Sequence, residues 1–203
     1  MKIAIGADHG GYELKTNLIA HLTGRGYQVT DVGTTSTAAV DYPVFARKVA
    51  EAVSSGQAER GIMIDGAGIG SSMVANKVPG VRAAMAYDVS SARNGREHND
   101  ANLLTLGAGL IGANLAAQIV DVFLTTDCTE PRHKRRVAMI TDVGGGAPVA
   151  APTTAPVGQL TPTASLGLAD LTDEDLALIV SRLTGMLGGA GDAFHGGPCV
   201  GSC

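Results

Sequence analysis

Tryptophan is absent from this chain of 203 residues, and aromatic and charged residues are scarce. Aromatic residues make up 3% of the sequence and charged residues 17%, while hydrophobic residues make up 45%. A core without large rings is built from Ala, Val, Ile, Leu and Met, which suits a parallel sheet between helices better than a β-sandwich. The hydrophobic fraction also excludes a chain that is disordered as a whole.

Long apolar runs and cysteines are scarce too. No apolar run reaches the roughly 20 residues of a membrane-spanning helix, and the run after Met1 is too short for a secretory signal peptide. Three cysteines, at 128, 199 and 203, form no disulfide framework. His195, Cys199 and Cys203 lack a fourth metal ligand. We therefore predict a cytoplasmic protein without a metal site, a cofactor or a membrane contact.

The net charge of −4 is unevenly distributed. Residues 1–143 hold 14 Lys and Arg and 14 Asp and Glu, whereas the remaining 60 residues hold only Arg182 against five acidic residues. The same 60 residues contain 12 of the 28 glycines and 5 of the 8 prolines. We predict a neutral globular domain over residues 1–143 and a separate C-terminal segment. A neutral domain with few aromatics is not expected to bind nucleic acid.

Apolar runs and helical spacings alternate through the first domain. Strands are predicted at residues 2–7, 27–32, 61–64, 82–86 and 103–106. Helices are predicted at residues 14–22, 43–53, 90–96, 112–124 and 132–140, with another beginning near Ser71. This order predicts an α/β fold, a three-layer α/β/α sandwich around a five-stranded, parallel, Rossmann-like (flavodoxin-like) sheet. Ligands of such sheets bind beyond the carboxyl ends of the strands. We expect Asp8–Gly11, Asp65–Ser72 and the segment near His98 to lie there.

The loop Asp65–Ser72 is the strongest local signal. Its alternating glycines allow backbone N–H groups to face an anion, and the start of a helix near Ser71 adds positive potential. The loop matches neither a dinucleotide-binding motif nor a P-loop. Asp65 at its entrance suits removal of a proton beside a carbonyl, while the N–H groups hold the enolate oxygen. The alternative is a tight turn that serves packing only.

Two further polar segments are candidates for chemistry. Asp8 and His9 end the first strand, although Asp8 alternatively caps the next helix. His98-Asn99-Asp100 lies in a polar turn before an apolar strand, where His98 is either functional or a surface residue.

A basic cluster begins at Arg132. Arg132 and Arg136 are four residues apart, so they share one side of a helix. Two guanidinium groups on one side suit a phosphate. The alternative is a solvated helix face.

These residues resemble the type B ribose-5-phosphate isomerases and the related galactose-6-phosphate isomerase subunits. The resemblance extends from about Lys2 to Ile140. It depends on motifs in order: Gly6-Ala7-Asp8-His9-Gly10-Gly11, Asp41-Tyr42-Pro43, Gly66-x-Gly68-x-Gly70, Ala75-Asn76-Lys77, Arg96-Glu97-His98-Asn99-Asp100-Ala101-Asn102 and Arg132-His133-x-x-Arg136-Val137. Each motif is weak alone, but six in order across 140 residues are specific.

The resemblance implies an enzyme that interconverts an aldose phosphate and a ketose phosphate through a cis-enediolate, without metal or nucleotide. Ribose 5-phosphate and ribulose 5-phosphate are the expected pair. A homodimer, or alternatively a tetramer, would share active sites at the dimer interface. By this resemblance the phosphate is held by His9, Arg132 and Arg136. His98 opens the sugar ring with Asp8 as a helper, and Tyr42 lines the pocket. Substrate and enediolate are held by Asn99 and by the loop residues Gly66, Gly68, Gly70 and Ser71.

The catalytic base departs from the family pattern. One branch has Cys where this chain has Asp65, and another has Glu where this chain has Ser71. A hydroxyl residue common two positions after that Cys is here Ala67. In one hypothesis Asp65 replaces the Cys as general base. In the other the chain binds a sugar phosphate with altered or absent catalysis.

The C-terminal segment divides into three parts. Residues 144–170 form a linker rich in Ala, Pro, Thr and Gly, and residues 188–203 are expected to be a flexible tail with exposed thiols. Between them, residues 171–187 predict an amphipathic helix with a capping box from Thr172 and Asp175. A tether plus such a helix resembles the encapsulation peptides of bacterial microcompartments, so a shell protein is the expected partner. The alternative is that the helix packs on its own domain.

Overall fold

A five-stranded parallel sheet forms the centre of the described structure. The computed structural model describes residues 1–143, so the linker, the 171–187 helix and the tail lie outside the described residues. The strands are β1 (Lys2–Ala7), β2 (Gln28–Asp31), β3 (Arg60–Asp65), β4 (Ala83–Met85) and β5 (Leu103–Gly107). Their order is β2-β1-β3-β5-β4, and every pair is parallel. The predicted parallel α/β fold is thus confirmed.

Six helices accompany the sheet in residues 1–143. They are α1 (Tyr12–Gly24), α2 (Tyr42–Ser54), α3 (Ile69–Ala75), α4 (Val89–Asn99), α5 (Ala113–Thr125) and α6 (Pro131–Asp142). The predicted helices are confirmed within a few residues at most ends. The exception is α4, which continues three residues past its predicted end at Arg96, so His98 lies in its last turn and not in a loop.

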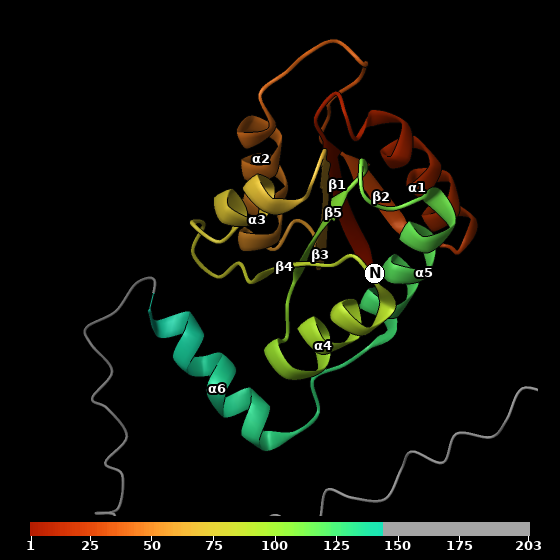
Figure 1. Ribbon diagram of the computed structural model, residues 1–203. Coiled ribbons are helices and arrows are strands. Elements are labelled where there is room, and N and C mark those ends of the chain that lie inside the picture. The colour runs from red at the N-terminus through yellow and green to blue at the C-terminus, as the bar shows by residue number, and fades with distance from the viewer. Residues whose placement is uncertain (144–203) are drawn as a thin grey trace, which may run out of the picture. The chain divides into compact units, whose positions relative to one another are not determined.

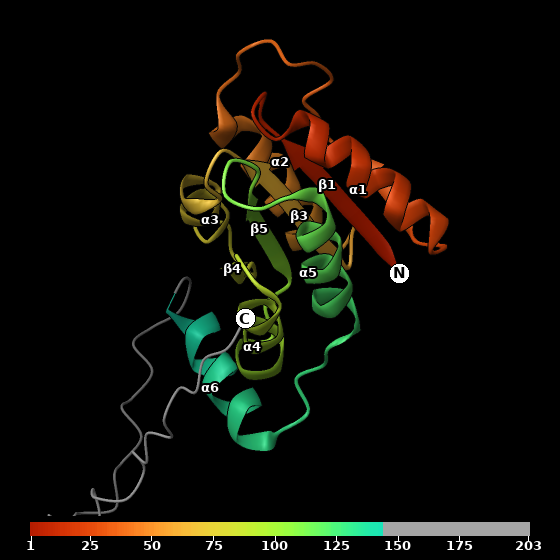
Figure 2. The same ribbon diagram turned by 45° about the vertical axis from the view of Figure 1, so that its right-hand side comes forward.

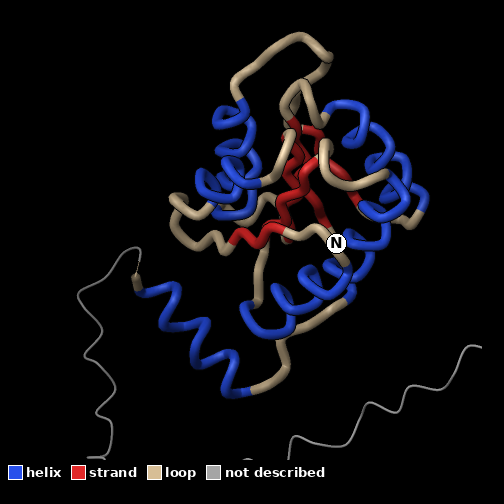
Figure 3. The backbone as a smooth tube through the Cα atoms, viewed as in Figure 1, coloured by secondary structure: helices blue, strands red, loops and turns tan. Residues whose placement is uncertain are grey.

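Helices cover both faces of the sheet, as Figures 1 and 2 show. Side chains of successive strand residues point to opposite faces, and the core divides accordingly. Ile62 and Ile64 pack with α1, α4 and α5, whereas Met63 packs with α2 and α3. Figure 3 shows the strands enclosed between the two helical layers. This alternation explains why the inner strands β1, β3 and β5 are buried at nearly every position, whereas the edge strand β2 is mostly exposed.

The connections after β1 and β3 meet at the carboxyl edge of the sheet. The chain crosses from β1 outward to β2 and then back to β3 on the other side of β1, which makes the β1–β3 boundary the switch point of the topology. Gly11 allows the close approach of these connections, and Gly68 lets the loop after β3 turn against the end of β5. A Cβ on Gly11 would lie 2.5 Å from the Ile64 carbonyl oxygen, and Gly68 has a φ of 80°. The fold therefore places two of the predicted loops side by side.

Candidate active site

The carboxyl edge gathers the first group of predicted site residues. Asp8 and His9 follow β1, and Asp65 ends β3. A Cβ on Gly10 would lie 3.4 Å from Asp8 Oδ1 and 3.9 Å from the Gly66 nitrogen, so the two loops are in contact. We call the set Asp8, His9, Tyr42 and the loop Asp65–Ser71 the carboxyl-edge cluster.

Asp65 is the most heavily hydrogen-bonded member of this cluster. Its side chain is buried, and Oδ1 accepts the N–H groups of Ala67, at 2.8 Å, and of Gly68. Oδ2 accepts the Ser71 N–H at 3.2 Å and also the Ser71 hydroxyl. The loop thus encloses an anion, as its glycines predicted, but the anion is its own carboxylate.

These four donors restrict what Asp65 can do. Each carboxylate oxygen has about two lone-pair sites, so both oxygens of Asp65 are saturated. Three of the donors are backbone N–H groups fixed by the loop, and only the Ser71 hydroxyl can rotate away. Among the hydrogen bonds of residues 1–143, none uses the N–H of Gly66 or Gly70. Those two groups remain available to a substrate oxygen.

Asp8 and Tyr42 frame the Asp65 loop. Asp8 is buried, and its Oδ1 accepts the Gly11 N–H at 3.0 Å in the turn before α1. The N-cap of α1 is Gly11, without a side-chain cap, so Asp8 does not cap the helix as the alternative proposed. Within residues 1–143, its Oδ2 has no hydrogen-bond partner. Tyr42 begins α2, and its ring lies against the loop, since a Cβ on Gly70 would come within 2.6 Å of the tyrosine Cζ.

The expectation that the segment near His98 also lies at the carboxyl edge is wrong. A helix after a parallel strand runs back along the sheet, so the end of α4 reaches the amino edge, where β5 begins at Leu103. From Leu103 to Gly107 the strand rises about 13 Å, which separates His98 and Asn99 from the Asp65 loop. Figure 1 shows α4 at the opposite end of the sheet from the loops after β1 and β3.

The amino edge gathers the remaining predicted residues. Helix α6 packs against α4, so the exposed side chains of His98, Asn99, Arg132 and Arg136 belong to one pair of helices. We call these four residues the amino-edge cluster. Sequence reasoning assigned no role to His133, whose buried ring lies 4.3 Å from the His98 ring between centroids. Its Nδ1 is 3.1 Å from the Glu97 carbonyl oxygen, which ties α6 to α4 beside His98.

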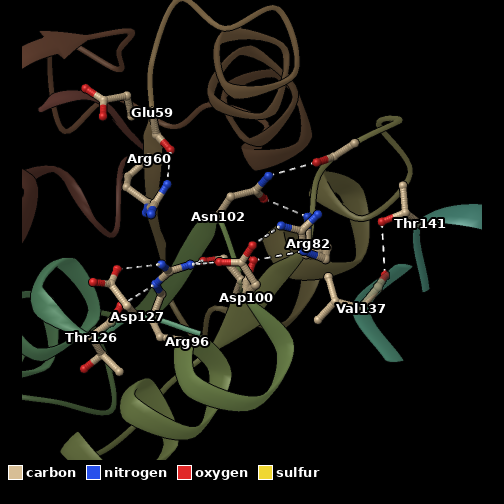
Figure 4. A network of polar contacts seen from close by, with 12 residues as sticks. Glu59, Arg60, Arg82, Arg96, Asp100, Asn102, Thr126, Asp127, Val137 and Thr141 are labelled. Atoms are coloured by element: carbon tan, nitrogen blue, oxygen red, sulfur yellow. Dashed lines mark hydrogen bonds and ion pairs between the residues drawn. The ribbon is translucent and has the colours of Figure 1, made fainter. Parts of the chain in front are cut away.

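A polar network anchors the end of α4 (Figure 4). Arg96 is 2% exposed and donates to Asp100 at 2.7 Å and to the carbonyl oxygens of Ala101, at 2.6 Å, and Thr126, at 3.1 Å. Arg82 donates to the other Asp100 carboxylate oxygen at 3.0 Å. A buried arginine with this many acceptors fixes the turn that follows Asn99. The spacing of Arg96 and Asp100 at i and i+4 was the available sequence signal.

Arg60 lies beside this network, but its guanidinium group has fewer hydrogen-bond partners than that of Arg96. Burial, followed by the positive charge of Arg96, lowers the pKa of Arg60 from its usual value. Its Nε is buried and has no hydrogen-bond partner, while another nitrogen donates to the Glu59 carbonyl at 2.7 Å. Arg60 is therefore a cost to the fold that its surroundings only partly offset.

Residues 1–143 show no group of three His, Cys, Asp or Glu side chains that could hold a metal ion. Within the same part of the chain, no helix is long and apolar enough to cross a membrane.

Known proteins share this fold and much of this sequence. The family model described as Ribose/Galactose Isomerase matches residues 3–140. Ribose-5-phosphate isomerase B of Escherichia coli (strain K12) is 44% identical over 142 residues, which cover 70% of this chain and 95% of that protein.

Solved structures of ribose-5-phosphate isomerases B share the fold of residues 1–143. Ribose-5-phosphate isomerase B of Clostridium thermocellum has a TM-score of 0.69 at 52% identity, over 70% of this chain and 97% of the other. The Mycoplasma genitalium protein of the same name, with bound ribulose 5-phosphate, has a TM-score of 0.68 at 37% identity, over 70% and 95% of the two chains. This chain belongs to the ribose/galactose isomerase family.

Proposed function

We propose that this chain is an aldose–ketose isomerase of a phosphorylated sugar, with ribose 5-phosphate and ribulose 5-phosphate as its substrate pair. Family membership and the names of its relatives support the reaction class. The observation that carries the proposal is the presence of two complementary groups of residues. The carboxyl-edge cluster supplies carboxylates and N–H donors, and the amino-edge cluster supplies an imidazole and two guanidinium groups.

The separation of the two clusters supports an assembly of at least two copies. Each copy carries both clusters at opposite edges of its sheet, so neither is complete alone. In a two-fold symmetric dimer, the carboxyl-edge cluster of one copy faces the amino-edge cluster of the other, and two equivalent sites result. A homodimer satisfies this requirement, and a tetramer would repeat it.

Within such a site the residues divide the reaction. Arg132, Arg136 and His9 hold the phosphate, and His98 moves the proton that opens the sugar ring. Asp65 Oδ2 then removes the proton from C2, the C–H electron pair forms the C1–C2 double bond, and negative charge develops on the C1 oxygen. Asn99 and the N–H groups of Gly66 and Gly70 stabilise that oxygen. The C2 hydroxyl then gives its proton to the C1 oxygen, and the resulting C2 oxyanion re-forms a C=O bond at C2. The electron pair of the C1–C2 double bond takes the proton back from Asp65 at C1, which completes the ketose and restores the base.

For Asp65 to act as the base, the Ser71 hydroxyl must turn away from Oδ2. Ser71 takes this role because the other three donors are backbone groups. The proposal therefore includes Ser71 as the hydroxyl that yields a lone pair of Asp65 when substrate is bound. Asp8, with one carboxylate oxygen free of partners in the described structure, is the matched comparison for the base.

A second candidate function follows from the same hydrogen bonds. If the four donors stay on Asp65, the chain binds the sugar phosphate without isomerising it. Deuterium exchange at C2 of several aldose phosphates in heavy water distinguishes the two functions, because exchange reports proton removal even when turnover is slow. Exchange by the wild type and none by Asp65→Asn supports the isomerase, whereas no exchange by the wild type supports the binding protein.

Mixing inactive variants tests the shared site. Asp65→Asn removes a carboxyl-edge residue and His98→Asn an amino-edge residue. Random mixing makes half of the dimers mixed, and each mixed dimer restores one of its two sites, so activity returns to about a quarter of wild type. Mixing two preparations of the same variant is the control. No recovery in the mixture would show that each site is built within one chain.

We further propose that residues 171–187 direct the enzyme from the cytoplasm into a bacterial microcompartment by binding a shell protein. The acidic helix start, the apolar stripe and the preceding linker of the sequence support this. Deletion of residues 147–203 is expected to leave the isomerase folded and to abolish co-purification with shell proteins. Loss of the folded domain on deletion would instead show that the helix packs on its own chain.

A further inference from the structure

The segment Thr34–Val40 crosses the carboxyl edge between β2 and α2, and we call it the strap. In Figures 1 and 2 it forms the long loop that precedes α2, on the side of the sheet where β1 ends. Thr35 to Ala39 are exposed, so the strap has little packing of its own. Its two ends, by contrast, make specific polar contacts, and both contacts lead to the carboxyl-edge cluster.

Lys15 of α1 fixes the first end of the strap. Its side chain is 1% exposed, and Nζ lies 2.7 Å from each carboxylate oxygen of Asp31 and 2.5 Å from the carbonyl oxygen of Thr34. The Thr34 N–H also donates to the Ala7 carbonyl at 2.8 Å. A buried ammonium with all its donors engaged holds its partners in one geometry. The strap therefore begins at a fixed position beside the end of β1.

Val40 fixes the other end on His9. The Val40 N–H donates to His9 Nδ1 at 3.3 Å. Because a backbone N–H can only donate, Nδ1 must carry a lone pair, and the neutral imidazole then carries its proton on Nε2. Within residues 1–143, Nε2 makes no hydrogen bond, and the side chain is exposed. His9 thus offers one N–H donor to a ligand.

We propose that the strap is a positioning element for His9, which it holds as the Nε2–H tautomer so that the ring donates to the substrate phosphate. This inference rests on the proposed phosphate-binding role of His9. Without the Val40 contact the ring is free to place its proton on Nδ1, and Nε2 then presents a lone pair that repels a phosphate oxygen. Lys15 acts at a distance, because it sets where the strap starts and hence where Val40 lies.

The test compares two proline variants of the full chain. Val40→Pro removes the donating N–H, since proline has none. Ala39→Pro places the same ring one residue earlier and leaves the Val40 N–H intact, and the Ala39 N–H makes none of the hydrogen bonds found in residues 1–143. Proteins labelled with ¹⁵N-histidine are compared by NMR at mildly alkaline pH, with His9→Gln to assign the signals. Inorganic phosphate is then titrated into each.

Wild type and Ala39→Pro are expected to show a His9 ring with its proton on Nε2, and Val40→Pro a mixture of both tautomers. Phosphate binding by Val40→Pro should weaken about two- to tenfold, the factor that one neutral hydrogen bond contributes. KM for the sugar phosphate should rise by a similar factor, while kcat changes little. Lys15→Met, which frees the first end, should shift the tautomer mixture in the same direction.

A wild-type His9 with its proton on Nδ1 would overturn the proposal, as would a Val40→Pro spectrum identical to that of Ala39→Pro. Lack of isomerisation by the wild type would refute the proposed function instead. The tautomer comparison does not depend on turnover, so the two failures are distinguishable.

Discussion

Replacement of Asp65 by Asn tests the centre of the site, because the two residues have the same shape and differ in charge and hydrogen-bonding capacity. The amide oxygen of the substituted side chain can still accept the N–H groups of Ala67 and Gly68. Its NH₂ group then faces the Ser71 N–H, which lies 3.2 Å from Oδ2 in the wild type. Two donors oppose each other there, whereas the Ser71 hydroxyl can turn and accept.

One buried N–H is therefore left without an acceptor, which costs about 1–3 kcal/mol of folding free energy. Loss of the negative charge next to the start of α3 lowers the free energy of unfolding by about a few tenths of a kcal/mol more. Removal of the base should lower kcat by about 10²- to 10⁴-fold. Phosphate binding should survive, since no phosphate-binding residue changes.

Three measurements at one protein concentration check this prediction: urea unfolding, isomerisation of ribose 5-phosphate and binding of inorganic phosphate. Asp8→Asn is the matched control, because it neutralises the other buried carboxylate of the same cluster. Isomerisation at the wild-type rate by Asp65→Asn would refute the assignment of the base, and loss of turnover only in Asp8→Asn would transfer the role to Asp8. Unchanged stability would refute the hydrogen-bond network.

Two further predictions contrast two arginines of the amino edge, the buried Arg96 and the half-buried Arg60. Arg96→Met should lower the free energy of unfolding by about 2–4 kcal/mol, since it leaves two backbone carbonyls and Asp100 with fewer donors. Chemical denaturation measures this free energy. A loss of no more than about 0.5 kcal/mol, as for a typical surface substitution, would contradict the prediction. Arg60→Met should change the same quantity by no more than about 1 kcal/mol, toward greater stability, because it removes a buried Nε without a partner and a cation whose pKa burial has already lowered. A strongly destabilised Arg60→Met protein would show that its contact with Glu59 outweighs the burial of its charge.

The order of elements was predictable because each strand and helix has its own signal. Apolar runs of four to six residues, helical spacings and glycine-rich connections were enough to predict the parallel sheet and the meeting of the loops after β1 and β3. That order also places His98 at the amino edge, because it precedes the strand at 103–106, but the local conformation at His98 was not predictable in the same way. Its polar neighbours suggested a turn, but the capping box at Asp88 and the buried Arg96 extend α4 through Asn99.

The residues of the Asp65 loop could be listed from the sequence, but their relations could not. Alternating glycines predicted N–H groups that converge on an anion. Only the fold showed that Asp65 is that anion and that the Ser71 hydroxyl is the donor that can move. The contact between Val40 and His9 links residues 31 positions apart, so no local sequence pattern predicts it.

The scarcity of aromatic residues determined that the core is aliphatic, and the alternation of apolar runs with helical spacings determined that the sheet is parallel, because composition and local periodicity fix what each segment can bury. The motifs determined the family, because they combine rare residue types at fixed spacings. The tertiary structure decided which of those residues share an edge of the sheet. The helix after each strand runs back toward the amino edge, so the predicted site residues fall into two clusters at opposite edges of the sheet.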